Sequence, residues 1–273
     1  MSNLFSIITV VLNDAEGLRK TASSIEQQAF SEFEWVVVDG GSSDGTLKQA
    51  RNIYGKAPIV HSAPDNGIYD AMNKGIQLSS GEYLVFMNAG DTFAGPDALG
   101  CLAQYVESQP SVDVVLGGTC QKINRCTFYR KPRDIRWIVH GLPSFHQSTL
   151  YRGSLIRSHP YNLDFPLLAD YAWLATACVE GIDVAYFNRP VSVFSVGGAS
   201  YTNLRQKFKD SYRVKRDILK LSKIAALSSS MHAILKTLIV MFAVFNACRF
   251  MNRQPVEAGN GSNDTEVEQY KFR

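Results

Sequence analysis

The chain has few cysteines, and none of them has the spacing of a metal site or a disulfide framework. Its five cysteines stand singly along 273 residues, without a C-x-x-C pair, which argues against both a zinc site and a disulfide scaffold. We therefore expect a reducing compartment, the cytosol. The net charge of +3 is also small, so the sequence does not indicate nucleic acid as a partner.

The chain also lacks a recognisable secretory leader and a long uncharged run. Its first apolar run, residues 5–12, is not preceded by Lys or Arg, and no A-x-A-like cleavage site is present, so we expect no secretory signal. Near the other end, the uncharged stretch from Thr237 to Cys248 is too short for a membrane span, which needs about 20 residues. Neither segment predicts a membrane-spanning helix.

Two common nucleotide-binding motifs are absent as well. The turn Gly40-Gly41-Ser42 is not followed by Gly-Lys-Ser/Thr, which excludes a P-loop. It does not continue as G-x-G-x-x-G either, which excludes the dinucleotide fingerprint of Rossmann folds.

What the chain does have is a regular alternation of strand-like and helix-like patterns up to residue 116. Its apolar fraction of 45% is ordinary for a globular protein. Strand patterns cover residues 5–12, 36–39, 58–61, 83–87 and 112–116, and helical patterns cover residues 15–28, 67–79 and 97–108. This alternation predicts an α/β fold with a mostly parallel central sheet flanked by helices.

Polar side chains follow the first two strand patterns. Asn13 comes directly after the first, and Asp39 ends the second, before a glycine- and serine-rich turn that contains Asp44. Ligands bind at the carboxyl ends of strands in open α/β sheets, so we expect these residues, together with Thr9, to face one crevice and bind a nucleotide. The alternative is an ordinary strand–helix loop, in which Asp39 and Asp44 only cap the next helix.

A further carboxylate, Asp91, lies just past the central strand pattern in the turn Asn88-Ala89-Gly90-Asp91. A carboxylate in this position is costly unless it meets a cation or hydrogen-bond donors. We therefore expect Asp91 to bind a metal ion, with phosphates of the ligand supplying other oxygens. The alternative is that Asp91 caps a turn and Asn88 satisfies backbone groups.

Four ordered segments resemble the motifs of the family 2 inverting glycosyltransferases, which have the GT-A fold. The segments are Ser6–Val10, Trp35–Thr46, Pro64–Gly75 and Phe86–Asp91. The resemblance covers roughly residues 1–200 and looks most like the bacterial branch that builds exopolysaccharide, colanic-acid-like or O-antigen repeat units. It implies a GT-A domain with a Rossmann-like nucleotide-binding half, acting in O-antigen lipopolysaccharide or exopolysaccharide biosynthesis.

The resemblance implies a UDP-sugar donor and a divalent cation, Mn²⁺ or Mg²⁺. Asp91 is similar to the metal-binding last Asp of the family's DXD motif. The first acidic position of that motif is Asn88 or Ala89 here, so we expect weak metal affinity. The donor-binding residues that the resemblance implies are Thr9, Asn13, Asp39, Asp44, Asp65, Asn73, Asn88, Gly90 and His146.

Two downstream segments resemble the catalytic motifs of the family. Ala169-Asp170-Tyr171 is similar to the motif that carries the catalytic base, and Ser144-Phe145-His146-Gln147 is similar to a His-Gln segment near the acceptor. The resemblance implies that Asp170 takes the proton of the acceptor hydroxyl. His146, Arg133 and Arg136 are candidates for stabilising the departing diphosphate. The alternatives are a first-turn helix residue for Asp170 and a structural histidine for His146.

The C-terminal part differs in composition from the rest. A basic helical pattern at 204–224 precedes an apolar helical pattern at 231–250 and a polar tail. We expect a GT-A domain at 1–200, with a nucleotide-sugar half at 1–118 and an acceptor-side half at 119–200. A helical appendage at 201–253 and a disordered tail at 254–273 follow.

A basic helix before an apolar helix suits peripheral attachment to the anionic cytoplasmic face of the plasma membrane. This location would place the protein beside a lipid-linked (undecaprenyl diphosphate) glycan acceptor. The alternatives are a helix pair packed on the core and a homodimer interface.

The sequence therefore predicts transfer of a hexose from a UDP-sugar to a lipid-linked glycan with inversion. A second hypothesis is a non-catalytic nucleotide-sugar-binding or scaffolding subunit of a polysaccharide assembly complex, against which Asp91 and Asp170 argue. A third is a sugar-nucleotide pyrophosphorylase, but the glycine-rich loop with Arg or Lys expected of that class is missing after the first strand.

Overall fold

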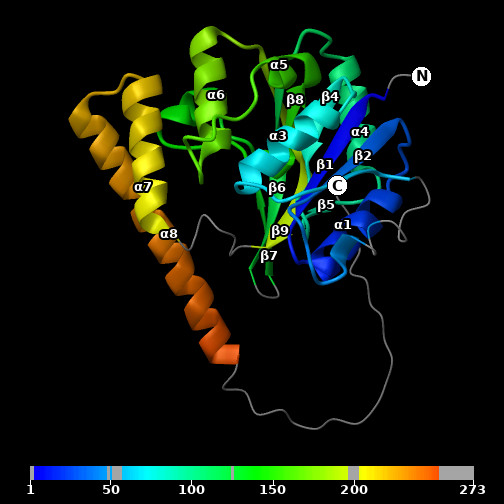
Figure 1. Ribbon diagram of the computed structural model, residues 1–273. Helices are drawn as coiled ribbons and strands as arrows, with labels where there is room; N and C mark the ends of the chain where they lie inside the picture. The colour runs from blue at the N-terminus through cyan, green and yellow to red at the C-terminus, as the bar shows by residue number, and fades with distance from the viewer. Residues whose placement is uncertain (1–2, 48–49, 51–56, 124–125, 196–202, 252–273) are drawn as a thin grey trace, which may run out of the picture.

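The fold is one nine-stranded sheet with helices on both faces (Figure 1). It comes from a computed structural model that describes residues 3–47, 50, 57–123, 126–195 and 203–251. The strand order is β3-β2-β1-β4-β8-β6-β9-β5, and β7 pairs with β6. The strands are Phe5–Val11 (β1), Phe33–Asp39 (β2), Ile59–Ser62 (β3), Tyr83–Phe86 (β4), Thr92–Phe93 (β5), Val114–Ile123 (β6), Cys126–Arg130 (β7), Thr149–Arg152 (β8) and Val184–Ser195 (β9).

Helices connect most of these strands and complete the chain. They are Ala15–Glu26 (α1), Ile68–Leu78 (α3), Ala98–Glu107 (α4), Gly153–Ser158 (α5), Ala169–Glu180 (α6), Leu204–Arg213 (α7) and Lys223–Met251 (α8). Short 3-10 turns cover Ile135–Val139 (η1) and His146–Ser148 (η2), and a π-helical turn covers Val214–Ile218 (η4).

The N-terminal half of the sheet, β3-β2-β1-β4, is parallel throughout, as the alternating pattern predicts. Every residue of β1 is buried, which is typical of parallel strands covered on both faces. Val11 pairs with Asp39 at the ends of β1 and β2. The polar residues after both strands therefore emerge at one edge of the sheet.

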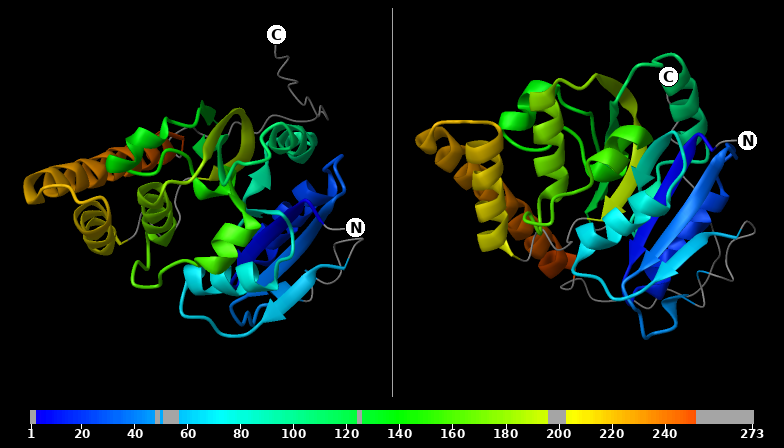
Figure 2. Two further views of the ribbon diagram at one scale, coloured as in Figure 1. Left: turned by 90° about the horizontal axis from the view of Figure 1, so that it is seen from above. Right: turned by 45° about the horizontal axis from the view of Figure 1, so that its top comes forward.

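Strand alternation divides the core into two layers. Ile7 and Trp35 face α1 and α4 on one side of the sheet, with Leu18 among their neighbours. Ile8 and Val36 face α3, α5 and α6 on the other side. Figure 2 shows these helices on the opposite faces of the sheet. Because the side-chain period of a strand is two, a residue's parity along β1 decides which layer it joins.

The last predicted strand, residues 112–116, is separated from β4 in the sheet by β8. It belongs to β6, which is antiparallel to β8, and β8 in turn is antiparallel to β4. The run is therefore not a direct parallel neighbour of β4. Its extension pairs with β7 as an antiparallel hairpin.

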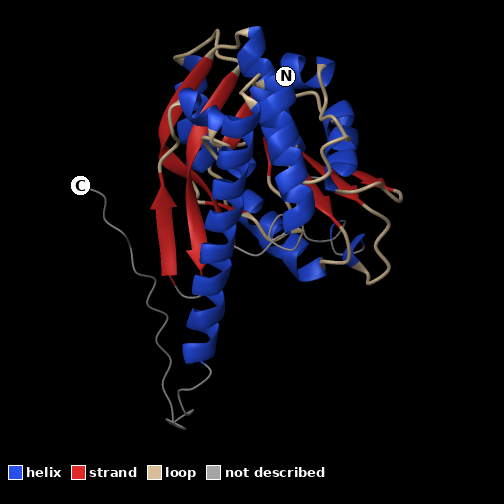
Figure 3. Cartoon of the chain, turned by 90° about the vertical axis from the view of Figure 1, so that its left-hand side faces the viewer, coloured by secondary structure: helices blue, strands red, loops and turns tan. Residues whose placement is uncertain are grey.

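The C-terminal helices pack on the body of the fold. Asp210 of α7 accepts a hydrogen bond from the backbone amide of Leu167 at 3.0 Å, and Ser229 of α8 donates to the carbonyl oxygen of Val139 at 3.1 Å. Figure 3 shows α8 running beyond the sheet. The predicted disordered tail at 254–273 lies outside the described residues.

Replacing Gly75 with Ala tests the packing of α3 on the parallel half. A Cβ atom on Gly75 would lie 2.5 Å from Cγ2 of the fully buried Ile8. Overpacking costs about 1–3 kcal/mol, against a gain in helix propensity of about 1 kcal/mol. We expect a net loss of about 1 kcal/mol in the free energy of unfolding, measured by urea denaturation. Gly95→Ala, which meets no atom within 4 Å, is the control, and a Gly75→Ala protein as stable as wild type would contradict this packing.

Candidate active site

A cavity of about 630 Å³ opens where β4 ends, between the sheet and the C-terminal helices. Both carboxylates that the sequence singles out for chemistry, Asp91 and Asp170, line it, as do Asn88 and His146. Cationic and aromatic side chains line it as well. They are Arg130, Arg133, Trp137, His140, Phe145, Lys207, His232 and Lys236.

Asp170 lies in the first turn of α6 and is only 4% exposed. Its Oδ1 atom accepts hydrogen bonds from the Tyr69 hydroxyl and from the Tyr171 backbone amide, both at 2.8 Å. Burial, and secondarily the Asp170 charge, raise the pKa of Tyr69 well above its ordinary value, so the phenol stays a donor. The carboxylate is therefore held in one orientation at the cavity wall.

His146 connects Asp170 to the turn after β4. Its Nδ1 atom lies 3.4 Å from Oδ2 of Asp170, and its Nε2 atom lies 3.1 Å from Nδ2 of Asn88. When the Asn88 amide donates to Nε2, Nδ1 carries the ring proton and points it at the carboxylate. The histidine thus joins the two acidic parts of the cavity.

Asp91 is 9% exposed and accepts a hydrogen bond from the Gln147 side chain. Burial raises its pKa to about 6, although His146 and Gln147 act in the opposite direction. Thr21 of α1 holds this turn in place. Its hydroxyl donates a hydrogen bond to the Asp91 backbone carbonyl at 2.7 Å and accepts one from the Gly90 backbone amide at 3.0 Å. Gly90 has a φ of +92°, a conformation that favours glycine.

The turn offers two oxygens suited to a divalent cation. Besides the Asp91 carboxylate, the buried Oδ1 atom of Asn88 has no hydrogen-bond partner. Within the described chain, no group of three or more His, Cys, Asp or Glu residues could hold a metal ion. The residues therefore fit a cation that takes most of its oxygens from substrate phosphates and water.

The predicted nucleotide residues at the ends of β1 and β2 do lie together. The buried Asp39 accepts hydrogen bonds from the Ser42 amide at 3.1 Å and from the Ser62 hydroxyl at 2.7 Å, and also from the Ser42 hydroxyl. The Asn13 amide donates to the same Ser42 hydroxyl at 2.7 Å. Ser42 therefore connects the loops that follow the two strands.

Asp65 joins this edge from the loop before α3. A Cβ atom on Gly40 would lie 2.5 Å from Oδ2 of Asp65, so any side chain at position 40 would displace this carboxylate from where it lies. The other oxygen of Asp65 accepts from the Gly67 amide at 2.9 Å. Asn13, Asp39 and Asp65 thus form one polar edge, which lies beside the cavity rather than in its lining.

Three of the predicted donor-binding side chains have structural partners instead. Thr9 is fully buried and accepts a hydrogen bond from Nε1 of Trp35 at 2.9 Å, on the layer that α1 and α4 cover. The Asn73 side chain pairs with the backbone of Tyr161 at 2.8 and 2.9 Å. Asp44 accepts from the Thr46 amide at 2.9 Å, which is the capping role of the alternative hypothesis.

The two arginine candidates differ sharply. The Arg133 guanidinium lies 3.9 Å from the ring of Trp137, and both residues line the cavity. Arg136 instead pairs with Asp134 at 2.8 Å on the exposed surface and does not line the cavity. Of the two arginines, only Arg133 is placed to contact a ligand in this cavity.

Several lining residues escaped the sequence analysis. Tyr69 lies inside the segment 64–75, and Gln147 inside 144–147, both of which resemble family motifs. The sequence pattern does not reveal, however, that each side chain donates a hydrogen bond to a carboxylate. Lys207 and Lys236 come from α7 and α8, far along the chain. Burial lowers the pKa of Lys207, and the negative charge of Asp170 acts in the opposite direction.

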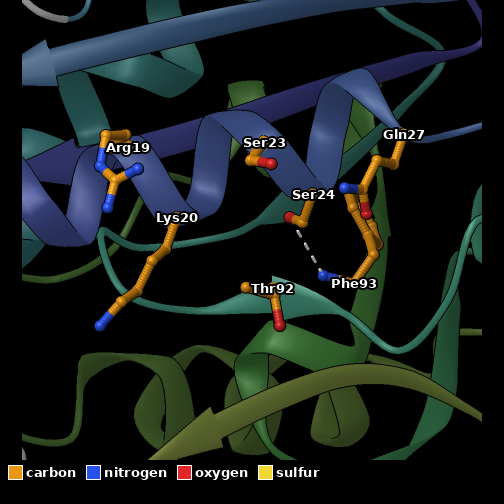
Figure 4. A pocket seen from close by; sticks show the side chains of 7 residues that line it. All are labelled: Arg19, Lys20, Ser23, Ser24, Gln27, Thr92 and Phe93. Atoms are coloured by element: carbon orange, nitrogen blue, oxygen red, sulfur yellow. Dashed lines mark hydrogen bonds between the residues drawn. The ribbon is translucent and has the colours of Figure 1, made fainter. Parts of the chain in front are cut away.

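A second hollow, of about 350 Å³, lies between α1 and β5 (Figure 4). Its lining residues are Arg19, Lys20, Ser23, Ser24, Gln27, Thr92 and Phe93. It contains no carboxylate and none of the residues that the sequence predicts for the site. The chemistry is therefore better assigned to the larger cavity.

Comparison with known proteins identifies the family of the chain. The model of the family described as "Glycosyl transferase family 2" matches residues 6–166, more than half of the chain. The chain belongs to this family.

This family 2 glycosyltransferase has relatives in sequence and neighbours in fold. A PGL/p-HBAD biosynthesis glycosyltransferase of Mycobacterium bovis is 37% identical over 175 residues, which cover 62% of this chain and 67% of the relative. TarS 1–349 of S. aureus in complex with UDP-GlcNAc aligns with a TM-score of 0.63 at 18% identity, covering 85% of this chain and 72% of that one.

The mannosyltransferase PcManGT of Pyrobaculum calidifontis, in complex with GDP-Man and Mn²⁺, aligns with a TM-score of 0.62 at 16% identity. The alignment covers 95% of this chain and 77% of PcManGT. At such identities the likeness shows the fold alone. It confirms the predicted GT-A-like α/β architecture for this family 2 glycosyltransferase.

Replacing Asp91 with Asn should stabilise this glycosyltransferase in the absence of metal. Burial raises the pKa of Asp91 from its ordinary value of 3.8 to about 6. Ionisation of Asp91 therefore lowers the free energy of unfolding, and this loss is absent below about pH 4 and complete above about pH 6. We expect Asp91→Asn to raise the free energy of unfolding at pH 7.5 by about 2 kcal/mol, and to have little effect at pH 4. Urea denaturation with EDTA measures this difference, with the exposed Asp217→Asn as control. Equal stability of Asp91→Asn and wild type at pH 7.5 would contradict it.

Proposed function

We propose that this glycosyltransferase transfers a hexose from a UDP-sugar to a lipid-linked glycan acceptor with inversion. The observation that carries the proposal is the oriented Asp170 carboxylate, which shares one cavity with the Asp91 turn. Tyr69 and the Tyr171 amide fix one oxygen of Asp170, and His146 lies beside the other. A base held in this way suits a single displacement.

In this reaction Asp170 takes the proton of an acceptor hydroxyl. The hydroxyl oxygen attacks the anomeric carbon of the donor sugar while the bond from that carbon to the UDP oxygen breaks. The leaving UDP carries away the bonding electron pair. A glycosidic bond to the acceptor replaces the glycosyl–phosphate bond to UDP, and inversion follows because attack and departure occur on opposite faces of the sugar.

Charge develops on the departing diphosphate, and the cavity is built to receive it. A Mn²⁺ or Mg²⁺ ion held by Asp91 and the Asn88 oxygen would neutralise part of that charge. Arg133 and Lys207 add fixed positive charge along the wall. TarS and PcManGT carry UDP-GlcNAc and GDP-Man in their complexes, which supports a nucleotide-sugar donor, and we favour UDP.

The polar edge beside the cavity suits the nucleoside end of the donor. The Asp39, Asn13 and Asp65 side chains gather where β1 and β2 end, which is where open α/β sheets bind ligands. The turn after β4, with Asp91, lines the adjoining cavity. A donor lying along this edge would place its diphosphate near Asp91 and its sugar toward Asp170.

The acceptor that we propose is a lipid-linked glycan. The mycobacterial relatives are named for PGL/p-HBAD biosynthesis, and the narrower pathway that the sequence suggests, O-antigen or exopolysaccharide synthesis, stays a prediction. A non-catalytic nucleotide-sugar-binding subunit remains the alternative. The three-sided orientation of Asp170 argues against it, because a binder has no need of a positioned base.

Replacing Asp170 with Asn tests the base. The Asn oxygen still accepts from Tyr69 but cannot take a proton, so we expect turnover to fall by about 1,000-fold while UDP affinity stays within about twofold of wild type. UDP release measures turnover and calorimetry measures binding. A non-catalytic binder would show no turnover in the wild type to lose, and unchanged turnover in Asp170→Asn would refute the assignment.

Replacing Tyr69 with Phe tests the orientation of that base. Loss of one hydrogen bond to a charged group costs about 1.5–3 kcal/mol, so we expect turnover to fall about tenfold or more. Tyr105→Phe is the matched control, because its hydroxyl donates to the Tyr186 carbonyl at 3.1 Å away from the cavity. Equal rates for Tyr69→Phe and Tyr105→Phe would show that Tyr69 does not orient Asp170.

The two arginines of the same loop offer a matched pair. Arg133→Gln removes a cation from the cavity wall, whereas Arg136→Gln removes one from the exposed surface. We expect the first change to lower kcat/KM for the donor about tenfold and the second to leave it within about twofold. An equal effect of both changes on initial rates of UDP release would argue against a role for Arg133.

A further inference from the structure

The outward face of α8 is a continuous apolar stripe. Apolar side chains recur along it at spacings of three and four residues, which places them on one face of a helix. Its ends, Ile224 and Phe242, are 82% and 71% exposed. The stripe consists of Ile224, Leu227, Met231, Leu235, Leu238 and Phe242, all of them exposed. An exposed apolar run of this length marks an interaction surface.

A different face of α8 is fixed to the body by small and polar residues. The buried Ser230 lies 3.2 Å from Ser211 of α7, oxygen to oxygen, and the buried Thr237 accepts a hydrogen bond from Lys207 at 2.9 Å. Ala226 is fully buried as well. These contacts settle which way α8 faces, so the stripe points away from the protein.

The same contacts decide how α8 meets a membrane. By length and composition, Lys223–Phe242 could cross a bilayer. A crossing helix needs lipid or other apolar groups around it at the depth of the hydrocarbon. Between residues 226 and 237, however, α8 is held against the globular body. A helix held along one side with an apolar stripe on another suits the interfacial plane of a bilayer.

Charge favours a lipid surface over a second copy of the chain. Lys220 and Lys223 are exposed where α8 begins, and the sequence of α8 contains no Asp or Glu. Across residues 203–242 the acids are Asp210, which is buried, and Asp217. Two copies joined through this face would bring cations together without carboxylates on either helix, whereas anionic lipid headgroups attract such cations.

We propose that α8 seats this protein on an anionic lipid bilayer, with the stripe from Ile224 to Phe242 in the interface. The same helix contributes His232 and Lys236 to the cavity wall, and Lys236 lies 5.4 Å from the ring of Trp137. An acceptor whose lipid lies in the bilayer therefore reaches Asp170 along α8. This last step rests on the proposed function, whereas the seating does not.

Vesicle binding tests the seating directly. The full chain is sedimented with vesicles of phosphatidylcholine alone or of phosphatidylcholine mixed with phosphatidylglycerol. We expect about tenfold tighter binding to the anionic vesicles. We also expect loss of that binding in a triple variant, Leu227→Ser, Leu235→Ser and Phe242→Ser, none of whose positions lines the cavity.

A second triple variant, Phe128→Ser, Leu163→Ser and Val179→Ser, is the matched control. It removes exposed apolar side chains from the body instead of α8 and should bind the vesicles like wild type. Circular dichroism and thermal unfolding show whether each variant folds. Equal vesicle binding by the stripe variant and wild type would overturn the proposal.

Binding of a second copy of the chain to the stripe would give a different result. A wild-type chain that ignores vesicles but sediments as a dimer, which the stripe variant converts to a monomer, would overturn the bilayer and assign the stripe to a second copy. UDP release without vesicles separates the two proposals. The stripe variant should release UDP like wild type, and anionic vesicle binding without UDP release from any donor would support the seating and refute the proposed function.

Discussion

The imidazole of His146 is the contact on which the geometry of the site depends. Its two nitrogens lie 3.4 Å from Asp170 and 3.1 Å from Asn88, so it sets how far the candidate base stands from the candidate metal turn. The sheet topology explains its position. Because β8 runs antiparallel beside β4, the residues just before β8 lie next to those just after β4. Inserting β8 there brings His146 to Asn88, which a purely parallel order would not do.

This arrangement also concentrates unfavourable electrostatics in one place. Two carboxylates are buried at the cavity, and burial raises the pKa of Asp91. Hydrogen bonds from Tyr69 and the Tyr171 amide stabilise Asp170, whereas Asp91 has Gln147 and the nearby His146. The less satisfied carboxylate is the one that a cation would relieve. A site that binds a metal ion and a diphosphate is expected to contain a buried carboxylate with a raised pKa when it is empty.

The sequence predicts the strand–helix alternation and the position of Asp91, because polar residues after buried strands emerge at one edge of the sheet. Asp170 and His146 are singled out by the family resemblance, since one lies in the first turn of α6 and the other just before β8. It misassigns Thr9 because strand parity turns that hydroxyl toward Trp35, and no pattern in one strand says which layer is covered by which helix. The pairing of the Asn73 side chain with the Tyr161 backbone joins segments far apart in the chain. The cations of α7 and α8 reach the cavity only through tertiary packing, so composition alone shows their charge but not their place.

The central claim is that Asp170 drives a single displacement at the anomeric carbon. The most direct test is the anomeric configuration of the first product, followed by proton NMR from an α-linked UDP-hexose and a suitable hydroxyl acceptor. The account predicts a β-linked product from the first turnovers. An α-linked product would contradict it, because retention requires chemistry other than one in-line attack assisted by Asp170.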